Sequence, residues 1–504
     1  MTAATVRELV ERAAASHPEA VYAVGTETGA AIRYAQLAAD CRQVGAWLRS
    51  RGIVAGDTIS LVMANGLQTL RLLLGAMHAG VCVNPVNLLS QGEAMRYVLD
   101  HADGKLVVVA PEWEERVRAL VAAIARPVAV AIVRPEDDMA FAVGASGVPV
   151  STTVDPEATA LLMYTSGTTG VPKGVMLTQA NLAANAAAIS AEHRLGESDR
   201  VLAVLPLYHI NAFAVTMLAP LVEAGSLVMA PKFSAAQFWR QAIDSECSWL
   251  NVVPTIVSYL LEGEAPPREA LGRIRFCRSA SSALPPEHHR AFEAKFGIGI
   301  VETMGLTETV APSFSNPLDA AARKIGSVGR ASGGEARIVD GEMQPVADGV
   351  TGELLVRGPH VMRGYYKNEA ATRDAFTPDR WLRTGDLGHR DPDGFFFVTG
   401  RIKELIIKGG ENIAPREIDE ALLDHPAVLE AAAVGIADVH YGQEILACVV
   451  LREGMACSVD ELRAFCTERI GRYKAPKSIR FVASLPRGPS GKVQRLKLLE
   501  LPDA

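Results

Sequence analysis

Short apolar runs alternate with longer segments rich in alanine and leucine through the first four hundred residues. Residues 58–65 (TISLVMAN) are typical of a buried strand, and residues 67–80 (LQTLRLLLGAMHAG) predict the helix that follows it. The same alternation predicts a further helix at 114–125 and further strands at 105–110, 200–206 and 226–231. Because buried strands that alternate with helices usually pair in parallel, the pattern predicts an α/β fold of parallel-rich sheets covered by helices.

The pattern changes after about residue 354. Short strands separated by glycine-rich turns are predicted at 353–358, 394–400 and 404–410. Beyond residue 415, helices are predicted at 416–426 and 459–470, and strands at 428–436, 445–451 and 479–486. These last elements are enough for a small α+β unit. We therefore predict a large N-terminal domain over residues 1–402 and a small α+β C-terminal domain over residues 403–504.

Length, charge and cysteine usage narrow the class of protein. A chain of 504 residues is too long for one hydrophobic core, which agrees with two domains. The formal net charge is −7 and no long basic run occurs, so we expect no nucleic-acid partner. The seven cysteines are scattered without a C-x-x-C pair, which argues against a disulfide framework or a zinc cluster and favours the cytoplasm. The longest apolar stretches, 72–85 and 120–133, are interrupted, so no membrane span is expected.

Residues 164–174 (YTSGTTGVPKG) form a loop rich in glycine and hydroxyl groups. Small residues let backbone N–H groups approach an anion, threonine hydroxyls add donors, and Lys173 adds a positive charge. The Walker pattern G-x-x-x-x-G-K-[ST] does not fit, because Pro172 stands where it needs glycine and Gly174 where it needs serine or threonine. The loop therefore predicts phosphate binding of another kind. Taken alone, the segment is also compatible with a flexible surface turn.

Five further motifs follow this loop in a fixed order. They lie at 205–213 (LPLYHINAF), 302–309 (ETMGLTET), 383–388 (RTGDLG), 400–420 (GRIKELIIKGGENIAPREIDE) and 485–495 (LPRGPSGKVQR). Together, the six motifs resemble the adenylate-forming acyl-CoA synthetase superfamily over nearly the whole chain. The resemblance implies a large N-terminal domain and a small, mobile C-terminal domain. It also implies that a carboxylic acid attacks the α-phosphate of ATP to give an acyl-adenylate and pyrophosphate, after which a thiol displaces AMP.

The resemblance implies a role for each residue of the phosphate site. The β- and γ-phosphates would be bound by Thr165, Ser166, Gly167, Thr168, Thr169, Gly170 and Lys173. Thr307 would contact the α-phosphate, and Glu308, together with Thr165, would bind Mg²⁺. Magnesium is a hard ion that prefers carboxylate and phosphate oxygen atoms, which fits these residue types.

The nucleoside half of ATP is implied to contact four further residues. Ser281 lies in the segment that resembles the floor of the adenine site, and Met304 stands where many relatives have a tyrosine that stacks on adenine. A thioether can pack on an aromatic face, so base binding is expected to persist. Asp386 and Arg401 match residues that bind the ribose hydroxyls, which a carboxylate can accept as a pair. A surface ion pair is the alternative for these two residues.

Lys492 is the predicted catalytic lysine of the C-terminal domain. It follows a Gly- and Pro-rich loop, and its ammonium group would bridge the attacking carboxylate and the α-phosphate. Lys403 matches the family's hinge between the two half-reactions. Gly409, Gly410 and Lys474 match the face that receives the thiol of coenzyme A.

Four residues are predicted at the acyl site. His209, Ser279 and Gly305 match positions that border it, although His209 could instead be a core histidine. Arg278 is unusual, because relatives mostly carry a small or apolar residue there and a buried arginine needs an anionic partner. That partner is either a second acidic group on a short substrate or an Asp or Glu of the protein. Several stretches resemble ligases of the oxalyl-CoA and malonyl-CoA synthetase type, but Tyr259 stands where the latter usually have arginine.

The predicted function is therefore an AMP-forming acid–CoA ligase that uses ATP, Mg²⁺ and coenzyme A to activate a short, anionic carboxylic acid. A medium-chain or aromatic acid–CoA ligase and an adenylation protein that loads a carrier protein are the alternatives. A luciferase-like oxidoreductase and a non-catalytic binding module are less favoured, since Glu308, Asp386 and Lys492 are all present. A homodimer is possible.

Overall fold

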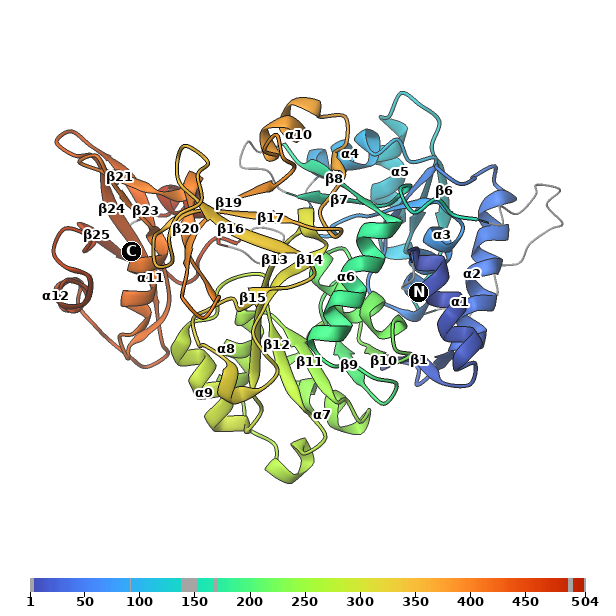
Figure 1. Ribbon diagram of the computed structural model, residues 1–504, viewed down its shortest axis with the longest axis horizontal. Helices are drawn as coiled ribbons and strands as arrows, with labels where there is room; N and C mark the ends of the chain where they lie inside the picture. Colours follow the sequence, from blue (N-terminus) through green and yellow to red (C-terminus); the bar gives the residue numbers. More distant parts are fainter. Residues whose placement is uncertain (1–3, 91, 137–152, 166–170, 488–492, 503–504) are drawn as a thin grey trace. The chain divides into compact units, whose positions relative to one another are not determined.

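The computed structural model describes residues 4–90, 92–136, 153–165, 171–487 and 493–502 (Figure 1). Contacts divide the chain into two compact units. Unit 1 comprises Met1–Leu284, His288–Glu335 and Val356–Leu382, and unit 2 comprises Pro285–Glu287, Ala336–Leu355 and Arg383–Ala504. Unit 2 thus includes two short segments before residue 402, and its last segment begins at Arg383. The domain boundary at 402/403 stays a prediction.

A nine-stranded sheet forms one half of unit 1. In spatial order its strands are β15 (Arg330–Ala331), β14 (Ala311–Ser315), β13 (Ile300–Leu306), β12 (Phe276–Ser279), β11 (Trp249–Val252), β9 (Arg200–Ala203), β10 (Ser226–Met229), β1 (Val21–Gly25) and β2 (Ala31–Arg33). The run from β13 to β1 is parallel, whereas β14, β15 and β2 pair antiparallel. The predicted parallel-rich α/β fold is confirmed, and the parallel register places the carboxyl ends of β11, β12 and β13 side by side.

A seven-stranded sheet forms the other half. Its strands are, in order, β18 (Gly364–Tyr365), β8 (Lys173–Thr178), β7 (Thr159–Thr165), β4 (Cys82–Pro85), β3 (Thr58–Val62), β5 (Leu106–Val109) and β6 (Ala129–Ile132). The strands from β7 to β6 are parallel, while β7 and β8 form an antiparallel hairpin around the predicted phosphate loop. The strand β18, from a much later part of the chain, completes this edge by pairing with β8.

Helix α6 (Gln179–Glu192) packs between the two sheets, in contact with β7 and β8 on one side and β14 on the other (Figure 1). It begins at a capping box in which Thr178 and Asn181 satisfy each other's backbone N–H groups. The other helices before residue 376 are α1 (Val6–Ser16), α2 (Tyr34–Arg49), α3 (Leu67–His78), α4 (Gly92–His101), α5 (Glu114–Ala122), α7 (Ala235–Asp244), α8 (Pro254–Glu262), α9 (Pro286–Phe296) and α10 (Glu369–Ala375).

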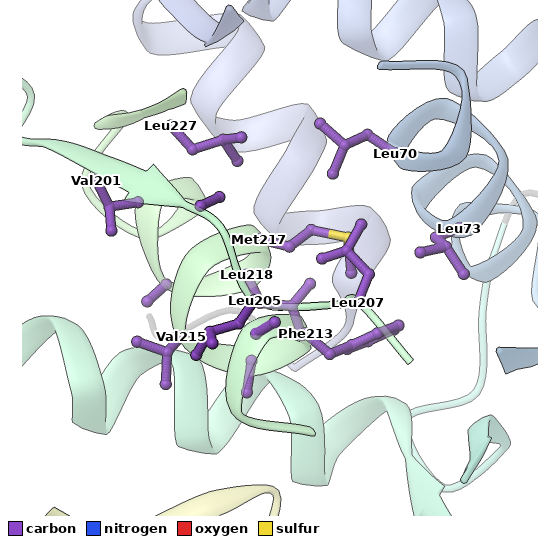
Figure 2. Packing of buried hydrophobic residues seen from close by; sticks show 14 of the residues in the cluster. Leu70, Leu73, Val201, Leu205, Leu207, Phe213, Val215, Met217, Leu218 and Leu227 are labelled. Atoms are coloured by element: carbon purple, nitrogen blue, oxygen red, sulfur yellow. The ribbon is translucent and has the colours of Figure 1, made fainter. Parts of the chain in front are cut away.

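The core of unit 1 is centred on a buried π-helix, η2 (Asn211–Leu218). Figure 2 shows Phe213 and Met217 of this helix among leucine side chains from α3 and from the segment after β9. A π-helix is wider than an α-helix and often occurs at functional sites. Removal of this apolar surface from water is the main force that holds the two sheets and η2 together.

Unit 2 contains most of a four-stranded sheet and all of a five-stranded one. The first consists of β16 (Glu335–Val339), β17 (Gly352–Arg357), β19 (Leu382–Arg390) and β20 (Phe396–Arg401). The second consists of β22 (Glu411–Ile413), β21 (Ile406–Lys408), β24 (Gly442–Leu451), β23 (Val428–Asp438) and β25 (Ser478–Phe481). Helices α11 (Pro415–Leu423) and α12 (Val459–Ile470) pack on the five-stranded sheet, which confirms the predicted α+β unit.

In the part of the chain that the structure describes, no helix combines the length and the apolar character that crossing a bilayer requires. All seven cysteines are free thiols, and six of them are buried.

Two buried histidines of unit 1 predict a loss of stability at acidic pH. Burial, and next the positive charge of Arg278, lower the pKa of His193 to about 3, and burial lowers that of His360 to about 4. Their unfolded pKa is about 6.5, so the unfolded state binds more protons and stability falls as the pH drops below that value. Between pH 7.5 and pH 5 each histidine should cost about 2 kcal/mol of unfolding free energy.

Urea unfolding followed by tryptophan fluorescence measures this loss, because all five tryptophans lie in unit 1. The double variant His193→Gln/His360→Gln should lose less stability than the wild type between the two pH values, and His440→Gln, at an exposed histidine of unit 2, should behave as wild type. An equally steep loss in the double variant would contradict the assignment.

Candidate functional site

The hairpin of β7 and β8 holds the two ends of the predicted phosphate loop. Thr165 and Lys173 are paired across the hairpin in register, so their side chains start from neighbouring positions at its tip. The remaining predicted phosphate contacts, Ser166, Gly167, Thr168, Thr169 and Gly170, lie outside the described residues. The structure thus places a hydroxyl and an ammonium group at the mouth of the loop, and phosphate binding there stays a prediction.

A tight chain reversal follows β13 and requires glycine at position 305. A Cβ atom on Gly305 would lie 1.8 Å from the carbonyl oxygen of Ala311, which no side chain can tolerate. Val310 and Ala311 have φ angles of 57° and 73°, a left-handed conformation that is strained for residues with a side chain. Backbone strain of this kind is concentrated at functional sites. The chain reversal therefore explains why glycine stands at position 305, independently of its predicted place at the substrate.

The reversal presents Thr307 and Glu308 at the end of β13. The hydroxyl of Thr309 accepts from the N–H of Leu306 at 3.0 Å and donates to the carbonyl of Ala311 at 2.9 Å, which fixes the turn. Thr307 and Glu308 are half-buried, so both side chains are held by a rigid frame yet remain reachable. Met304, which lies on β13 three residues before Thr307, is likewise half-buried.

Glu308 contacts Tyr365, a residue that the sequence analysis did not select. The phenolic O–H of Tyr365 donates to Oε1 of Glu308 at 2.8 Å, and Lys173 Nζ lies 4.9 Å from the centroid of the same ring. Burial, and next the Glu308 carboxylate, raise the pKa of Tyr365 well above its usual range, so the phenol keeps its proton. One tyrosine thus contacts both the predicted phosphate lysine and the predicted metal ligand.

The donor set around Glu308 fits Mg²⁺. Within the described ranges, no group of three or more His, Cys, Asp or Glu side chains could hold a metal ion, and Oε2 of Glu308 has no protein partner there. Magnesium is commonly bound by one or two carboxylates together with substrate phosphates and water. A single open carboxylate beside a phosphate loop matches that mode of binding.

Arg278 is the one charged residue among the largest fully buried side chains of the described residues. It is 1 % exposed, and its Nη1 donates to Oδ1 of Asn211 at 2.6 Å and to Oδ1 of Asn251 at 2.8 Å. Burial lowers its pKa to about 9, so the guanidinium is still charged at neutral pH. Asn251 lies directly beside Arg278 because β11 and β12 pair in that register, and Asn211 begins the π-helix η2.

The alternative in which Arg278 pairs with an acidic residue of the protein finds no support in the ranges that the structure describes. Among the residues that the structure describes, its partners are amide oxygens, and no carboxylate lies within ion-pair distance. Its Nε has no hydrogen-bond partner there either. A buried cation without a counter-charge is costly, so this arginine is a prime candidate for binding an anion. Nothing in the sequence pattern pointed to Asn211 or Asn251.

Ser279, predicted for the acyl site, and Ser281, predicted for the adenine site, follow this arginine in the sequence. Ser279 is fully buried and its hydroxyl has no described partner, whereas the hydroxyl of Ser281 accepts from Nδ2 of Asn211 at 3.2 Å. His209 is half-buried and lies two residues before η2. Its ring packs edge-on against that of Tyr208, with the ring centroids 4.8 Å apart. Ser279 and Ser281 thus both follow Arg278 along the chain, and Ser281 shares the partner Asn211 with it. The position of His209 at the acyl pocket stays a prediction.

Asp386 and Arg401 of unit 2 form an ion pair. They face each other in register on β19 and β20, with Arg401 Nε 2.8 Å from Asp386 Oδ1. Asp386 is 2 % exposed and the Arg401 side chain 42 % exposed, so the ion pair of the alternative is present, with its carboxylate buried. Lys403 follows in the short turn Ile402–Glu404 and is exposed. Ribose binding and the hinge role stay predictions.

The predicted thiol-side residues also lie in unit 2. Gly409 and Gly410 form the turn between β21 and β22 with φ angles of 57° and 89°. Lys474 Nζ lies 2.7 Å from Oε1 of Glu417, so the carboxylate compensates the lysine's charge in this structure. Lys492 lies outside the described residues.

Just beyond that lysine, Arg495 anchors the chain. It contacts Asp419 at 2.6 Å and Glu404 at 3.1 Å, and it donates to the carbonyl of Ala433 at 2.9 Å. These bonds tie the segment after residue 492 to the body of unit 2, while the segment before it is tied by the ion pair of Arg487 with Glu430 at 2.5 Å.

Comparisons with known proteins agree with this description. The family described as "AMP-binding enzyme" matches residues 10–366, and "AMP-binding enzyme C-terminal domain" matches residues 417–492. Sulfoacetate–CoA ligase of Cupriavidus necator is 55% identical over 98% of this chain and 97% of its own, and oxalate–CoA ligase of Arabidopsis thaliana is 35% identical over 88% of both. The crystal structure of ATP-bound MatB from Rhodopseudomonas palustris superposes with a TM-score of 0.92 at 30% identity, covering 99% of each chain.

Proposed function

This chain belongs to the AMP-binding enzyme family and is an AMP-forming acid–CoA ligase, and we propose that its substrate is a short carboxylic acid with a second anionic group. The observation that carries the proposal is Arg278, a buried guanidinium whose described partners are two amide oxygens. A sulfonate or second carboxylate would supply the missing negative charge in a bidentate contact. The names of the sulfoacetate– and oxalate–CoA ligases, both enzymes of two-carbon anionic acids, support this chemistry.

The described residues suggest how the first half-reaction proceeds. Two anions, ATP and the substrate carboxylate, must approach each other, so positive charge and hydrogen-bond donors are needed where they meet. Lys173 and the hydroxyl of Thr165 would bind the β- and γ-phosphates, and Thr307 would donate to the α-phosphate. Glu308 would hold Mg²⁺, which supplies further positive charge to the phosphate oxygens. Lys492 would then bridge the carboxylate and the α-phosphate while the acyl-adenylate forms.

The second half-reaction requires a thiol. Coenzyme A is the proposed acceptor, in keeping with the names of the relatives, and Gly409, Gly410 and Lys474 are the proposed thiol-side residues. For Lys474 to contact coenzyme A, its ion pair with Glu417 would have to open. The seven free cysteines support a cytoplasmic location, and a homodimer stays a prediction that sedimentation would test.

A screen for release of AMP and pyrophosphate tests the substrate class. Purified enzyme is given ATP, Mg²⁺, coenzyme A and one acid from matched pairs, such as sulfoacetate with propionate, or oxalate and malonate with acetate and butyrate. Because a buried charged site discriminates strongly against partners that leave it unpaired, we expect kcat/KM for the best dianionic acid to exceed that of its monoanionic match by at least about a hundredfold.

Two outcomes would contradict this proposal. Equal or better activity with octanoate or benzoate would favour a medium-chain or aromatic acid–CoA ligase. Transfer to the pantetheine of a carrier protein, but not to coenzyme A, would favour an adenylation protein.

A further inference from the structure

Tyr365 connects three parts of the proposed nucleotide site that are far apart in the sequence. Its backbone belongs to β18 and pairs with Val175 of β8, two residues beyond Lys173. The O–H of its side chain donates to Oε1 of Glu308 at 2.8 Å. The ring between these points receives the ammonium group of Lys173 at 4.9 Å from its centroid. Strand β8 and the chain reversal after β13 are thus joined through one aromatic side chain.

Both contacts have a chemical consequence. The hydrogen bond occupies one oxygen of the Glu308 carboxylate and restrains its orientation, and the other oxygen would then be available to hold Mg²⁺. The cation–π contact restrains Lys173 without neutralising its charge, because the ring face carries no formal charge. Since the phenol keeps its proton at neutral pH, the tyrosine is the donor and the Glu308 carboxylate the acceptor of this hydrogen bond.

Tyr365 is itself held firmly. Its backbone N–H donates to the hydroxyl of Thr372 in α10 at 2.9 Å, and the N–H of Met362, on the same segment, donates to the carbonyl of Glu308 at 2.7 Å. The segment from 362 to 365 therefore contacts Glu308 through both its backbone and a side chain. Contacts of this kind around a metal ligand orient it and raise its affinity for the ion.

We propose that Tyr365 is a positioning residue that holds the Glu308 carboxylate for Mg²⁺ and the Lys173 ammonium for the ATP phosphates. The inference rests on the proposed function of this site in binding Mg²⁺·ATP. It involves no proton transfer and no covalent step: the phenol stays protonated and acts only through the two groups that it orients.

Binding of Mn²⁺, observed by its electron paramagnetic resonance signal in the presence of a non-hydrolysable ATP analogue, tests the proposal. Tyr365→Phe keeps the ring beside Lys173 and removes only the hydroxyl, so Mn²⁺ affinity should fall about tenfold, the loss typical of a removed partner of a metal ligand. Binding of the analogue without metal should be unchanged. Tyr365→Leu removes the ring as well, and should weaken metal-free analogue binding in addition.

Tyr366→Phe is the matched control, because the neighbouring tyrosine donates to Asp103 at 2.8 Å and has no contact with Glu308 among the described residues. It should bind Mn²⁺ as the wild type does. Wild-type Mn²⁺ affinity in Tyr365→Phe, or an equal loss in Tyr366→Phe, would overturn the positioning role.

A kinetic measurement separates this role from a general structural one. In Tyr365→Phe the Mg²⁺ concentration for half-maximal pyrophosphate release should rise about tenfold, while conversion of supplied acyl-adenylate to the thioester should stay within twofold of wild type. Equal slowing of both half-reactions would overturn the proposal. If no acid in the screen yields AMP but Tyr365→Phe still weakens Mn²⁺ binding, the proposed function fails and the inference about Tyr365 stands.

Discussion

Lys492→Ala is expected to lose adenylate formation by about a thousandfold while it still converts supplied acyl-adenylate to the thioester. The reason is electrostatic. The attacking carboxylate and the α-phosphate repel each other, and a single ammonium group between them stabilises the charge that develops and also positions both reactants. Once the adenylate exists, this repulsion is gone, so the thiol step no longer needs the lysine.

Two separate assays measure the effect. Pyrophosphate release with the best acid of the screen reports the first half-reaction, and thioester formation from chemically prepared acyl-adenylate reports the second. Lys497→Ala is the matched control, because Lys497 is an exposed lysine five residues further along the same segment. A parallel loss in both half-reactions, or an equal loss in Lys497→Ala, would remove the proposed role of Lys492.

Arg278→Leu is expected to reverse the substrate preference. Removing one partner of a buried charge pair typically costs about 3–5 kcal/mol, so kcat/KM for the dianionic acid should fall at least about a hundredfold. The monoanionic match of that acid has no second charge to leave unpaired in the variant, and its kcat/KM should stay level or rise. Lys173 and Glu308 are untouched by the change, so the KM for ATP should move little.

The ratio of kcat/KM for sulfoacetate to that for propionate is the quantity to compare. Arg275→Leu serves as the control, since Arg275 lies three residues before Arg278 but pairs with Asp199 at 2.6 Å. That variant should lose stability and keep its preference. Thermal unfolding of both variants shows whether each is folded at the assay temperature. A folded Arg278→Leu enzyme with the wild-type ratio would contradict the role of Arg278 in substrate choice.

Much of the architecture could be predicted from local pattern. The strand and helix at 58–65 and 67–80 appear as β3 and α3, since β-branched apolar runs favour strands and alanine- and leucine-rich stretches favour helices. The C-terminal α+β unit could be predicted for the same reason. The structure adds that α12 begins at a capping box of Ser458 and Glu461. The order of six motifs predicted the family, because spacing along the chain is itself a property of the sequence.

The chemistry of the interior depended on pairing between distant residues. Arg278 suggested an anion, but the sequence left open whether a protein carboxylate supplied it. Among the residues that it describes, the structure brings Asn251 and Asn211, 27 and 67 residues away, to the guanidinium. Tyr365 and Glu308 are likewise separated by 57 residues, and no periodicity links them.

The sequence alone therefore determined which elements form and which reactive groups are available. Propensity, apolar period and turn chemistry act over a few neighbours, so they can be inferred from the printed chain. Which groups meet was decided by strand order and register, which depend on how whole sheets pack and on the cost of leaving a buried charge without a partner. In the described part of this protein, strand order and register bring amide oxygens to Arg278. They also bring a tyrosine into contact with both Lys173 and Glu308.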